Sequence, residues 1–135
     1  MAISDRLAPF QPIMLSIFRI MFGLLILQHG LQKWFGFPAA NPAFANIQLM
    51  TMVGMAGVIE LVGGALIAAG LFTRYAAFIV AGEMAVGYFT SHFPRSFFPI
   101  ANGGNLITAY CFATLYLVFA GPGPLSLDTL LRKAR

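Results

Sequence analysis

Charged residues are scarce in this chain of 135 residues. Asp, Glu, Lys and Arg together make up 9% of it, whereas an ordinary soluble domain has about one quarter. Eight residues are Lys or Arg and only four are Asp or Glu, while 59% of the chain is hydrophobic. This composition excludes an ordinary soluble domain and indicates an integral membrane protein.

Cysteine is almost absent as well. Cys111 is the single cysteine, which excludes an internal disulfide and a relay between two thiols of one chain. The sequence also has no CxxCH segment, no cysteine spacing of an iron–sulfur protein and no flavin-binding fingerprint. We interpret Cys111 as a small packing residue within a helix. A redox function would therefore need electrons from a soluble or membrane partner.

Four apolar windows occupy most of the chain, and each approaches the roughly 20 residues that a helix needs to cross a bilayer. They cover residues 13–33, 50–70, 74–93 and 104–120, with polar, Pro or Gly breaks between them. The first window lacks a convincing small-residue cleavage site, so we interpret it as a span rather than a signal peptide. We predict an all-α, polytopic membrane protein, with residues 1–135 forming one four-transmembrane-helix bundle in the lipid bilayer.

The basic residues are distributed unevenly over the two sides that these spans define. Four spans place both termini and the 71–74 turn on one side, and the 34–49 and 94–103 loops on the other. Because Lys and Arg are enriched on the cytoplasmic side, both termini should be cytoplasmic. The net charge of +4 then reflects topology, and we expect no nucleic-acid partner. The first side carries Arg6, Arg74, Arg132, Lys133 and Arg135, and the second carries Lys33 and Arg95.

Local residues predict where several helices begin and end. Gly70 is expected to close the second span and Thr73 to cap the third, so these spans should form a tight antiparallel hairpin. After the Gly-Pro-Gly-Pro segment at 121–124, Ser126 is a predicted N-cap. The residues that follow combine leucines with basic residues, which predicts a short C-terminal helix at the membrane interface.

Three charged residues lie inside the apolar windows: Arg19, Glu60 and Glu83. Charge in hydrocarbon needs a partner or a function. With 3.6 residues per turn, each charge shares a helix face with glycines, so we expect it to face the bundle interior. We predict that Arg19 pairs with one glutamate and that at least one glutamate is protonated. The glycines are Gly54, Gly57 and Gly64 beside Glu60, Gly87 beside Glu83, and Gly23 and Gly30 beside Arg19.

These three charges have more than one interpretation. They form either a structural ion pair that holds the bundle together or a proton-exchanging site with Glu60, Glu83 and Arg19 as its catalytic residues. A third alternative is that they face lipid or water.

Polar residues also occur near the predicted outer ends of the spans: His29, Lys33, His92 and Asn105. The histidines are hydrogen-bonded structural residues, ligands of haem or a metal, or contacts of a bound ligand. Haem is disfavoured because continuing the third helix puts His92 about 180° from Glu83. We predict no metal site and interpret the four residues as contacts for a quinone or another flat ligand, whose carbonyl oxygens suit such donors.

Aromatic residues are concentrated in the two outer loops. They either anchor these loops at the level of the lipid headgroups or form a hydrophobic lid over an outward-facing pocket. The residues concerned are Trp34, Phe35, Phe37, Phe97 and Phe98.

Several motifs occur in an order that resembles the DoxX family. The segment GVIELVGGALIAAGLFTRYAA occupies residues 57–77, Asn-Gly-Gly begins at Asn102 and GPGPLSLD begins at Gly121. The resemblance covers nearly the whole chain. It implies a four-helix protein of the bacterial inner membrane, described as an oxidoreductase component or a quinol-oxidase-associated subunit. Similar proteins are linked to thiol stress or to thiosulfate-to-quinone electron transfer. The pattern also includes Arg19, Gly23, His29, Gly30, Lys33 and His92.

One position departs from the family pattern. An acidic residue commonly follows the Asn-Gly-Gly element, whereas this chain has Asn105. If that acid accepts protons in similar proteins, this chain lacks the group or uses Glu83 instead.

Two classes of function remain. In the first, the protein is a redox accessory subunit that binds quinone or quinol, with His29 and Lys33 orienting the ligand and Glu60 or Glu83 handling protons. In the second, it is a non-enzymatic small-molecule carrier or a scaffold for other subunits. The glycine stripes also favour homo-oligomers.

Overall fold

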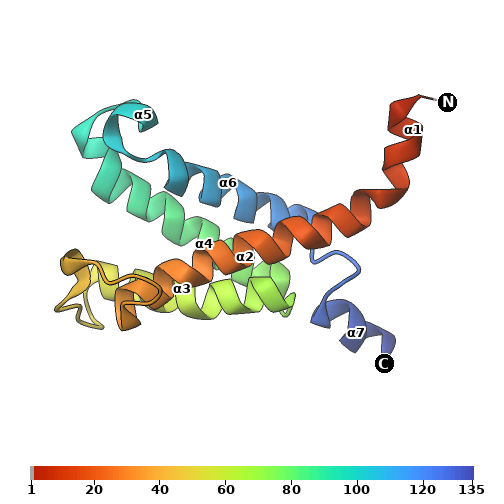
Figure 1. Cartoon of the computed structure of the whole chain (residues 1–135), viewed down its shortest axis with the longest axis horizontal. Helices are drawn as coiled ribbons and strands as arrows, with labels where there is room; N and C mark the ends of the chain where they lie inside the picture. The colour runs from red at the N-terminus through yellow and green to blue at the C-terminus, as the bar shows by residue number, and fades with distance from the viewer. Residues whose placement is uncertain (1) are drawn as a thin grey trace.

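Helices form most of the backbone (Figure 1). The computed structural model describes residues 2–135, and no strand occurs within them. The prediction of an all-α protein is therefore confirmed. The α-helices are α1 (Ile3–Leu7), α2 (Gln11–Phe35), α3 (Met52–Ala69), α4 (Thr73–Gly87), α5 (Pro99–Asn102), α6 (Asn105–Ala120) and α7 (Leu127–Lys133). The shorter elements are the 3₁₀ turns Ala8–Phe10, Pro42–Phe44 and Phe93–Arg95, and the π-helical turn Tyr88–His92.

α2 is the longest helix, and its ends follow from the sequence. Pro12 lies in its first turn, where the missing backbone N–H removes no helical hydrogen bond. The helix ends at Gly36, whose φ of 64° is the left-handed conformation that glycine adopts readily. Its 25 residues extend about 37 Å, which is enough to cross a hydrocarbon core of about 30 Å.

α2 and α3 pack against each other more extensively than any other pair of helices. Glycines on both helices allow the close approach. A methyl group on Gly30 would lie 2.6 Å from the backbone nitrogen of Leu61, and one on Gly64 would lie 2.5 Å from that of Leu27. The predicted glycine stripes therefore face each other, as expected where backbones approach in a membrane.

α4 packs against α6 on one side and against α3 on the other. Figure 1 shows the four long helices as two pairs, α2 with α3 and α4 with α6. The core between the pairs is mainly aliphatic, with one tyrosine. Its buried members are Ile26, Ile67, Ala76, Ala77, Val80, Met84, Tyr110 and Leu117.

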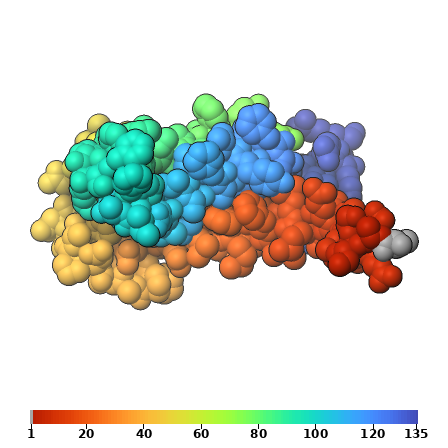
Figure 2. Space-filling view, turned by 90° about the horizontal axis from the view of Figure 1, so that it is seen from above, coloured from red at the N-terminus to blue at the C-terminus, as the bar shows by residue number. Residues whose placement is uncertain are grey.

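Both termini lie at the same end of the bundle. α1, the α3–α4 turn and α7 lie at this terminal end, whereas segments 36–51 and 88–104 lie at the opposite, loop end (Figures 1 and 2). This arrangement follows from four long helices that alternate in direction.

Two helical runs are long and apolar enough to cross a membrane, namely Ile3–Phe35 and Met52–Ala69. α6 is apolar but has 16 residues, or about 24 Å, and α4 has 15 residues before the π-helical turn continues it. α2, α3 and α6 begin and end within two residues of the predicted windows. The apolar helices and the composition together indicate a membrane protein.

Two of the three predicted helix caps are confirmed. Gly70 ends α3 with a φ of 71°, and Ser126 caps α7 by accepting the backbone N–H of Thr129 at 3.2 Å. The prediction that Thr73 caps the third span is wrong, because Thr73 is the first residue of α4. Its backbone N–H and that of Phe72 donate instead to the Asp128 carboxylate, at 2.9 and 2.8 Å. A distant side chain thus replaces the local cap.

Candidate functional site

The last turns of α2 and the middle of α3 bring Lys33 beside Glu60. Lys33 Nζ donates to Glu60 Oε2 at 2.5 Å, which is the one salt bridge among residues 2–135. The two side chains are 13% and 6% exposed, so the pair is largely removed from the surface. The predicted inward orientation of Glu60 is confirmed. Because the two helices approach through glycines, the pair lies between two rigid backbones.

Glu83 of α4 contributes a second carboxyl group. Its Oε2 is buried and has no hydrogen-bond partner within residues 2–135. The charges of Glu60 and Lys33 both act on Glu83, so the three groups are electrostatically coupled. A buried polar atom without a partner is rare, because it loses hydration without compensation. Glu83 Oε2 is therefore an acceptor available for a proton or a ligand.

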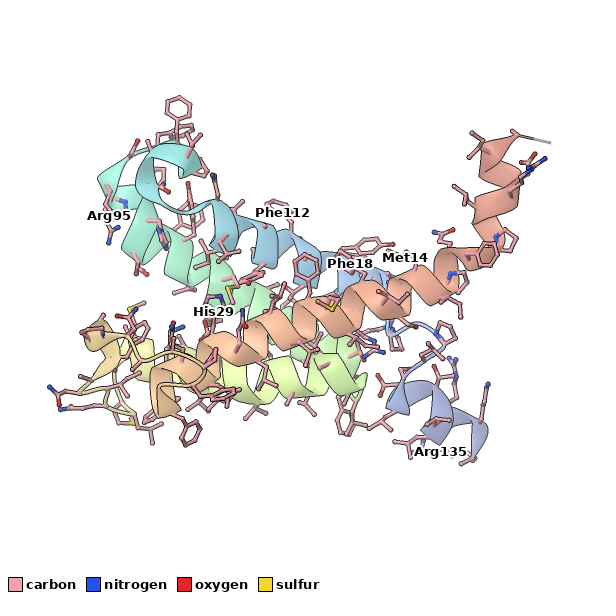
Figure 3. The ribbon with its side chains drawn as sticks, in the orientation of Figure 1. Met14, Phe18, His29, Arg95, Phe112 and Arg135 are labelled. Atoms are coloured by element: carbon pink, nitrogen blue, oxygen red, sulfur yellow. The ribbon has the colours of Figure 1, made fainter. Side chains whose placement is uncertain are left out.

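His29 and Tyr110 complete this group of side chains. Tyr110 Oη lies 3.3 Å from His29 Nε2, and the two rings meet edge to face with centroids 5.5 Å apart. Figure 3 shows His29 on the side of α2 that faces α4 and α6. The charge of Lys33 acts on His29, and that of Glu60 acts on Tyr110.

We call His29, Lys33, Glu60, Glu83 and Tyr110 the polar cluster. All four long helices contribute to it, two residues coming from α2 and one each from α3, α4 and α6. It combines one ammonium, two carboxyl groups, an imidazole and a phenol, next to a mainly aliphatic core. Such a set can bind the oxygen atoms of a ligand and can take up or release protons.

The predicted pairing of Arg19 with a glutamate is wrong. The Arg19 side chain is fully buried, but it donates to backbone carbonyl oxygens. Two of these acceptors lie in the last turn of α3, where a cation also meets the negative end of the helix dipole. Arg19 thus caps α3 and holds the 122–125 segment against α2 and α3. It does not belong to the polar cluster. The acceptors are the carbonyl oxygens of Ile67, Ala68, Pro122 and Leu125.

The predicted ligand contacts separate into two groups. His29 and Lys33 belong to the polar cluster, whereas His92 and Asn105 make no hydrogen bond with it within residues 2–135. His92 Nδ1 is 3.0 Å from the Asn102 carbonyl oxygen, and Asn105 is an exposed first residue of α6. That all four contact one ligand stays a prediction. Within residues 2–135, no group of three His, Cys, Asp or Glu side chains is arranged to hold a metal ion.

Sequence reasoning missed Tyr110. Helical spacing puts Asn105, Thr108, Phe112 and Tyr116 on one face of α6, but Phe112 and Tyr116 are more than half exposed. Figure 3 shows Phe112 on the outer side of α6. The buried face instead carries Tyr110, Ala113, Thr114 and Leu117. Residues three, four and seven positions after Tyr110 share this face, as the helical period predicts. The exposed face and the buried face each contain one tyrosine and one threonine, so composition alone does not show which of them is buried.

Within residues 2–135, no aromatic ring contact joins Trp34, Phe35 or Phe37 to Phe97 or Phe98, and the lid over a pocket stays a prediction. Trp34 Nε1 donates to the Gly54 carbonyl oxygen at 3.3 Å, which attaches this ring to α3. Phe97 and Phe98 meet edge to face with centroids 5.3 Å apart, and both are exposed. Exposed rings at the end of a bundle suit anchoring among lipid headgroups.

Two surface hollows, of about 330 and 280 Å³, lie at the terminal end. Phe18 and Tyr116 line the first, and Arg74 and Arg132 line the second. Neither hollow contains a member of the polar cluster. The outward-facing pocket at the loop end stays a prediction.

Comparisons with known proteins support the resemblance that the motifs indicate. The family model DoxX matches residues 14–93. An uncharacterized protein of Haemophilus influenzae is 41% identical over 127 residues, which cover 92% of this chain and 95% of that protein. A second uncharacterized protein of the same organism is 29% identical over 131 residues, covering 88% of this chain and 83% of that protein. No solved structure matches significantly. The chain belongs to the DoxX family.

Proposed function

We propose that the protein crosses the bacterial inner membrane four times, with both termini in the cytoplasm. α2 and α3 have the required length, and α4 with its π-helical turn extends the third span to His92. α6 is shorter, but a bilayer accommodates a short span by local thinning at modest cost. The basic residues support the orientation, because five of them lie at the terminal end. These are Arg6, Arg74, Arg132, Lys133 and Arg135.

Within this bundle, the polar cluster is proposed to bind a quinone, a quinol or a similar small apolar ligand. The observation that carries the proposal is the buried Glu83 Oε2 without a partner, next to the charges of Lys33 and Glu60. A group in that state is stabilised by gaining a proton or a hydrogen-bond donor. A quinol hydroxyl supplies such a donor.

The roles of the residues follow from their chemistry. Glu83 accepts a hydrogen bond or a proton from a ligand hydroxyl, and Lys33 offsets the negative charge that remains nearby. His29 and Tyr110, which already contact each other, present a second donor and acceptor on the α6 side. Electrons come from a partner protein, because Cys111 is the single thiol. The protein then acts as an accessory subunit of a membrane oxidoreductase.

The alternative is a non-enzymatic carrier or scaffold. The hydrogen bonds within the polar cluster favour this alternative. Lys33 already pairs with Glu60, and His29 already pairs with Tyr110, so these groups need no ligand as a partner. The tight glycine contact between α2 and α3 also suits a rigid structural module.

Quinone retention separates the two functions. The full-length protein is purified in mild detergent, and its lipid extract is analysed for quinone by mass spectrometry. We expect quinone with the wild type and at least a tenfold loss in Glu83→Gln, since one hydrogen bond to a charged group contributes about 1.5–3 kcal/mol. Asp5→Asn is the matched control, because it makes the same change of acid to amide at an exposed position.

Two results would contradict the quinone proposal. One is a wild-type protein that retains no quinone and shows no rise in its thermal midpoint when ubiquinone is added. The other is equal quinone retention in Glu83→Gln and wild type. The first result would leave the carrier or scaffold function.

A further inference from the structure

The second hollow has the chemistry of an anion site. It lies between the start of α4 and α7, has a volume of about 280 Å³ and is lined by the side chains of Arg74 and Arg132. The aromatic side chains of Phe72 and Tyr75 also line it and are 61% and 76% exposed.

Both arginines have donors to spare. Arg74 Nη1 donates to the carbonyl oxygens of Val118 and Phe119, at 2.5 and 2.7 Å, which fixes the guanidinium at the end of α6. No hydrogen bond from its Nε or Nη2 is formed within residues 2–135. Arg132 likewise makes neither a hydrogen bond nor an ion pair with that part of the chain. Guanidinium groups bind phosphate oxygens with paired N–H donors, so the two side chains are suited to one phosphate.

The acidic residue in the hollow is already hydrogen-bonded. The Asp128 carboxylate accepts the backbone N–H groups of Phe72 and Thr73, so the start of α4 stabilises its charge. Thr73 also lines the hollow, is 1% exposed and has its hydroxyl beside the Asp128 carboxylate. The lining therefore combines two cations with unused donors and one carboxylate that is already hydrogen-bonded.

We propose that this hollow binds the phosphate of an anionic phospholipid headgroup. Its place at the terminal end, among exposed aromatic and basic side chains, matches the headgroup level of the proposed bundle. The other hollow at this end offers no such binding, because no charged residue lines it. The inference rests on the proposed membrane crossing, but not on ligand binding by the polar cluster.

Lipid selectivity tests the proposal directly. The full-length protein in detergent is mixed with equal amounts of phosphatidylglycerol and phosphatidylcholine, and the bound lipids are counted by native mass spectrometry. We expect preferential retention of phosphatidylglycerol by the wild type. Arg132→Gln should weaken this binding about tenfold, as expected for one charge-assisted hydrogen bond.

Arg135→Gln is the matched control. It removes the same charge from the same exposed tail, but Arg135 does not line the hollow. Figure 3 shows Arg135 at the far end of α7. We expect its binding of phosphatidylglycerol to stay within about twofold of the wild type, because surface charges far from a bound ion are largely screened. Arg74 is left unchanged because it also caps α6.

Three results would overturn the proposal. Equal losses in Arg132→Gln and Arg135→Gln would mean general charge attraction. Equal retention of the two lipids by the wild type would mean that the site does not select an anion. If inorganic phosphate alone raised the thermal midpoint as much as phosphatidylglycerol, the ligand would be a free anion. Quinone retention is measured independently, so failure of one proposal leaves the other intact.

Discussion

Lys33 and Glu60 form an ion pair across the contact between α2 and α3, with 27 positions separating them in the sequence. The same contact places Arg19 beyond the last turn of α3, where it meets carbonyl oxygens. One face of α2 therefore carries two cations with different roles. Lys33 neutralises an acid inside the bundle, and Arg19 holds backbone segments together at the terminal end.

Lys33→Met should destabilise the protein by about 3–5 kcal/mol, because Glu60 would remain buried without its partner. The free energy of unfolding in detergent, measured by denaturant titration, reports this change. The double variant Lys33→Met/Glu60→Leu should recover most of the loss, since replacing both members of a buried pair is often neutral. Lys133→Met is the exposed control. A Lys33→Met protein as stable as the control would show that the pair contributes nothing.

Arg19→Lys should destabilise the protein by about 3 kcal/mol or more, although the charge is kept. A lysine ammonium cannot replace the planar guanidinium group, which donates hydrogen bonds to four carbonyl oxygens. Each hydrogen bond lost from a charged group costs about 1.5–3 kcal/mol. Hydrogen exchange should rise first in residues 121–133. Arg6→Lys makes the same change at an exposed site and should be neutral. Unaltered exchange in that segment would contradict the role of Arg19 as an anchor.

Gly30→Ala should destabilise the protein, whereas Gly82→Ala should not. A methyl group on Gly30 would collide with the α3 backbone and should cost about 1–3 kcal/mol, whereas nothing lies within 4 Å of one on Gly82. Gly82→Ala should therefore be neutral or stabilise α4 by up to about 1 kcal/mol. Thermal unfolding of both variants checks this difference. Equal midpoints would mean that α2 and α3 separate more easily than their packing implies.

The ionisation of Asp128 should make the stability of the folded protein depend on pH. Burial raises the pKa of this carboxyl group, but hydrogen bonds from the backbone and side chain of Thr73, the backbone hydrogen bond from Phe72 and the charge of Arg19 outweigh it, so the pKa lies below its ordinary value. The ionised carboxylate therefore stabilises the folded state above about pH 4, the ordinary carboxyl range, and this contribution disappears as the pH falls through the lower, folded-state pKa.

Asp128→Asn tests this dependence. The variant should have a lower thermal midpoint than the wild type at pH 7, and the difference should shrink below about pH 4. Asp5→Asn, at an exposed position, should leave the curve of midpoint against pH unchanged. A constant difference between Asp128→Asn and wild type from pH 3 to pH 7 would exclude a contribution from the charge of Asp128.

Glu60→Gln should keep the fold and impair function. The amide retains the size of the side chain and still accepts a hydrogen bond from Lys33, but it can no longer exchange a proton. Growth of a strain that lacks its own copy of the protein, complemented with the variant, measures function, and membrane content measures folding. Full complementation would remove Glu60 from the mechanism, whereas loss of the protein from the membrane would indicate a structural role.

The helical period determines which residues share a face, and those predictions hold for α2 and α3. Gly23, Gly30, Gly57 and Gly64 face one another, and Glu60 points into the bundle. On α6 the same period allowed two polar stripes, and the packing against α4 selected the one with Tyr110. Sequence periodicity fixes the angle around a helix, but a choice between two similar faces depends on the neighbouring helix.

The amino-acid sequence by itself determined that the chain is helical, apolar and close-packed through glycines, because composition and residue spacing act locally. Only the tertiary structure decided which charges meet. Leu27 lies opposite Gly64 and Gly30 opposite Leu61, and this register along the helix axes brings Lys33 to Glu60 while it carries Arg19 past the end of α3. Likewise, the return of α7 to the start of α4 supplies the Asp128 cap. The register of α2 against α3 and the position of α7 beside α4 both arise from the packing of whole helices. No local sequence pattern encodes them.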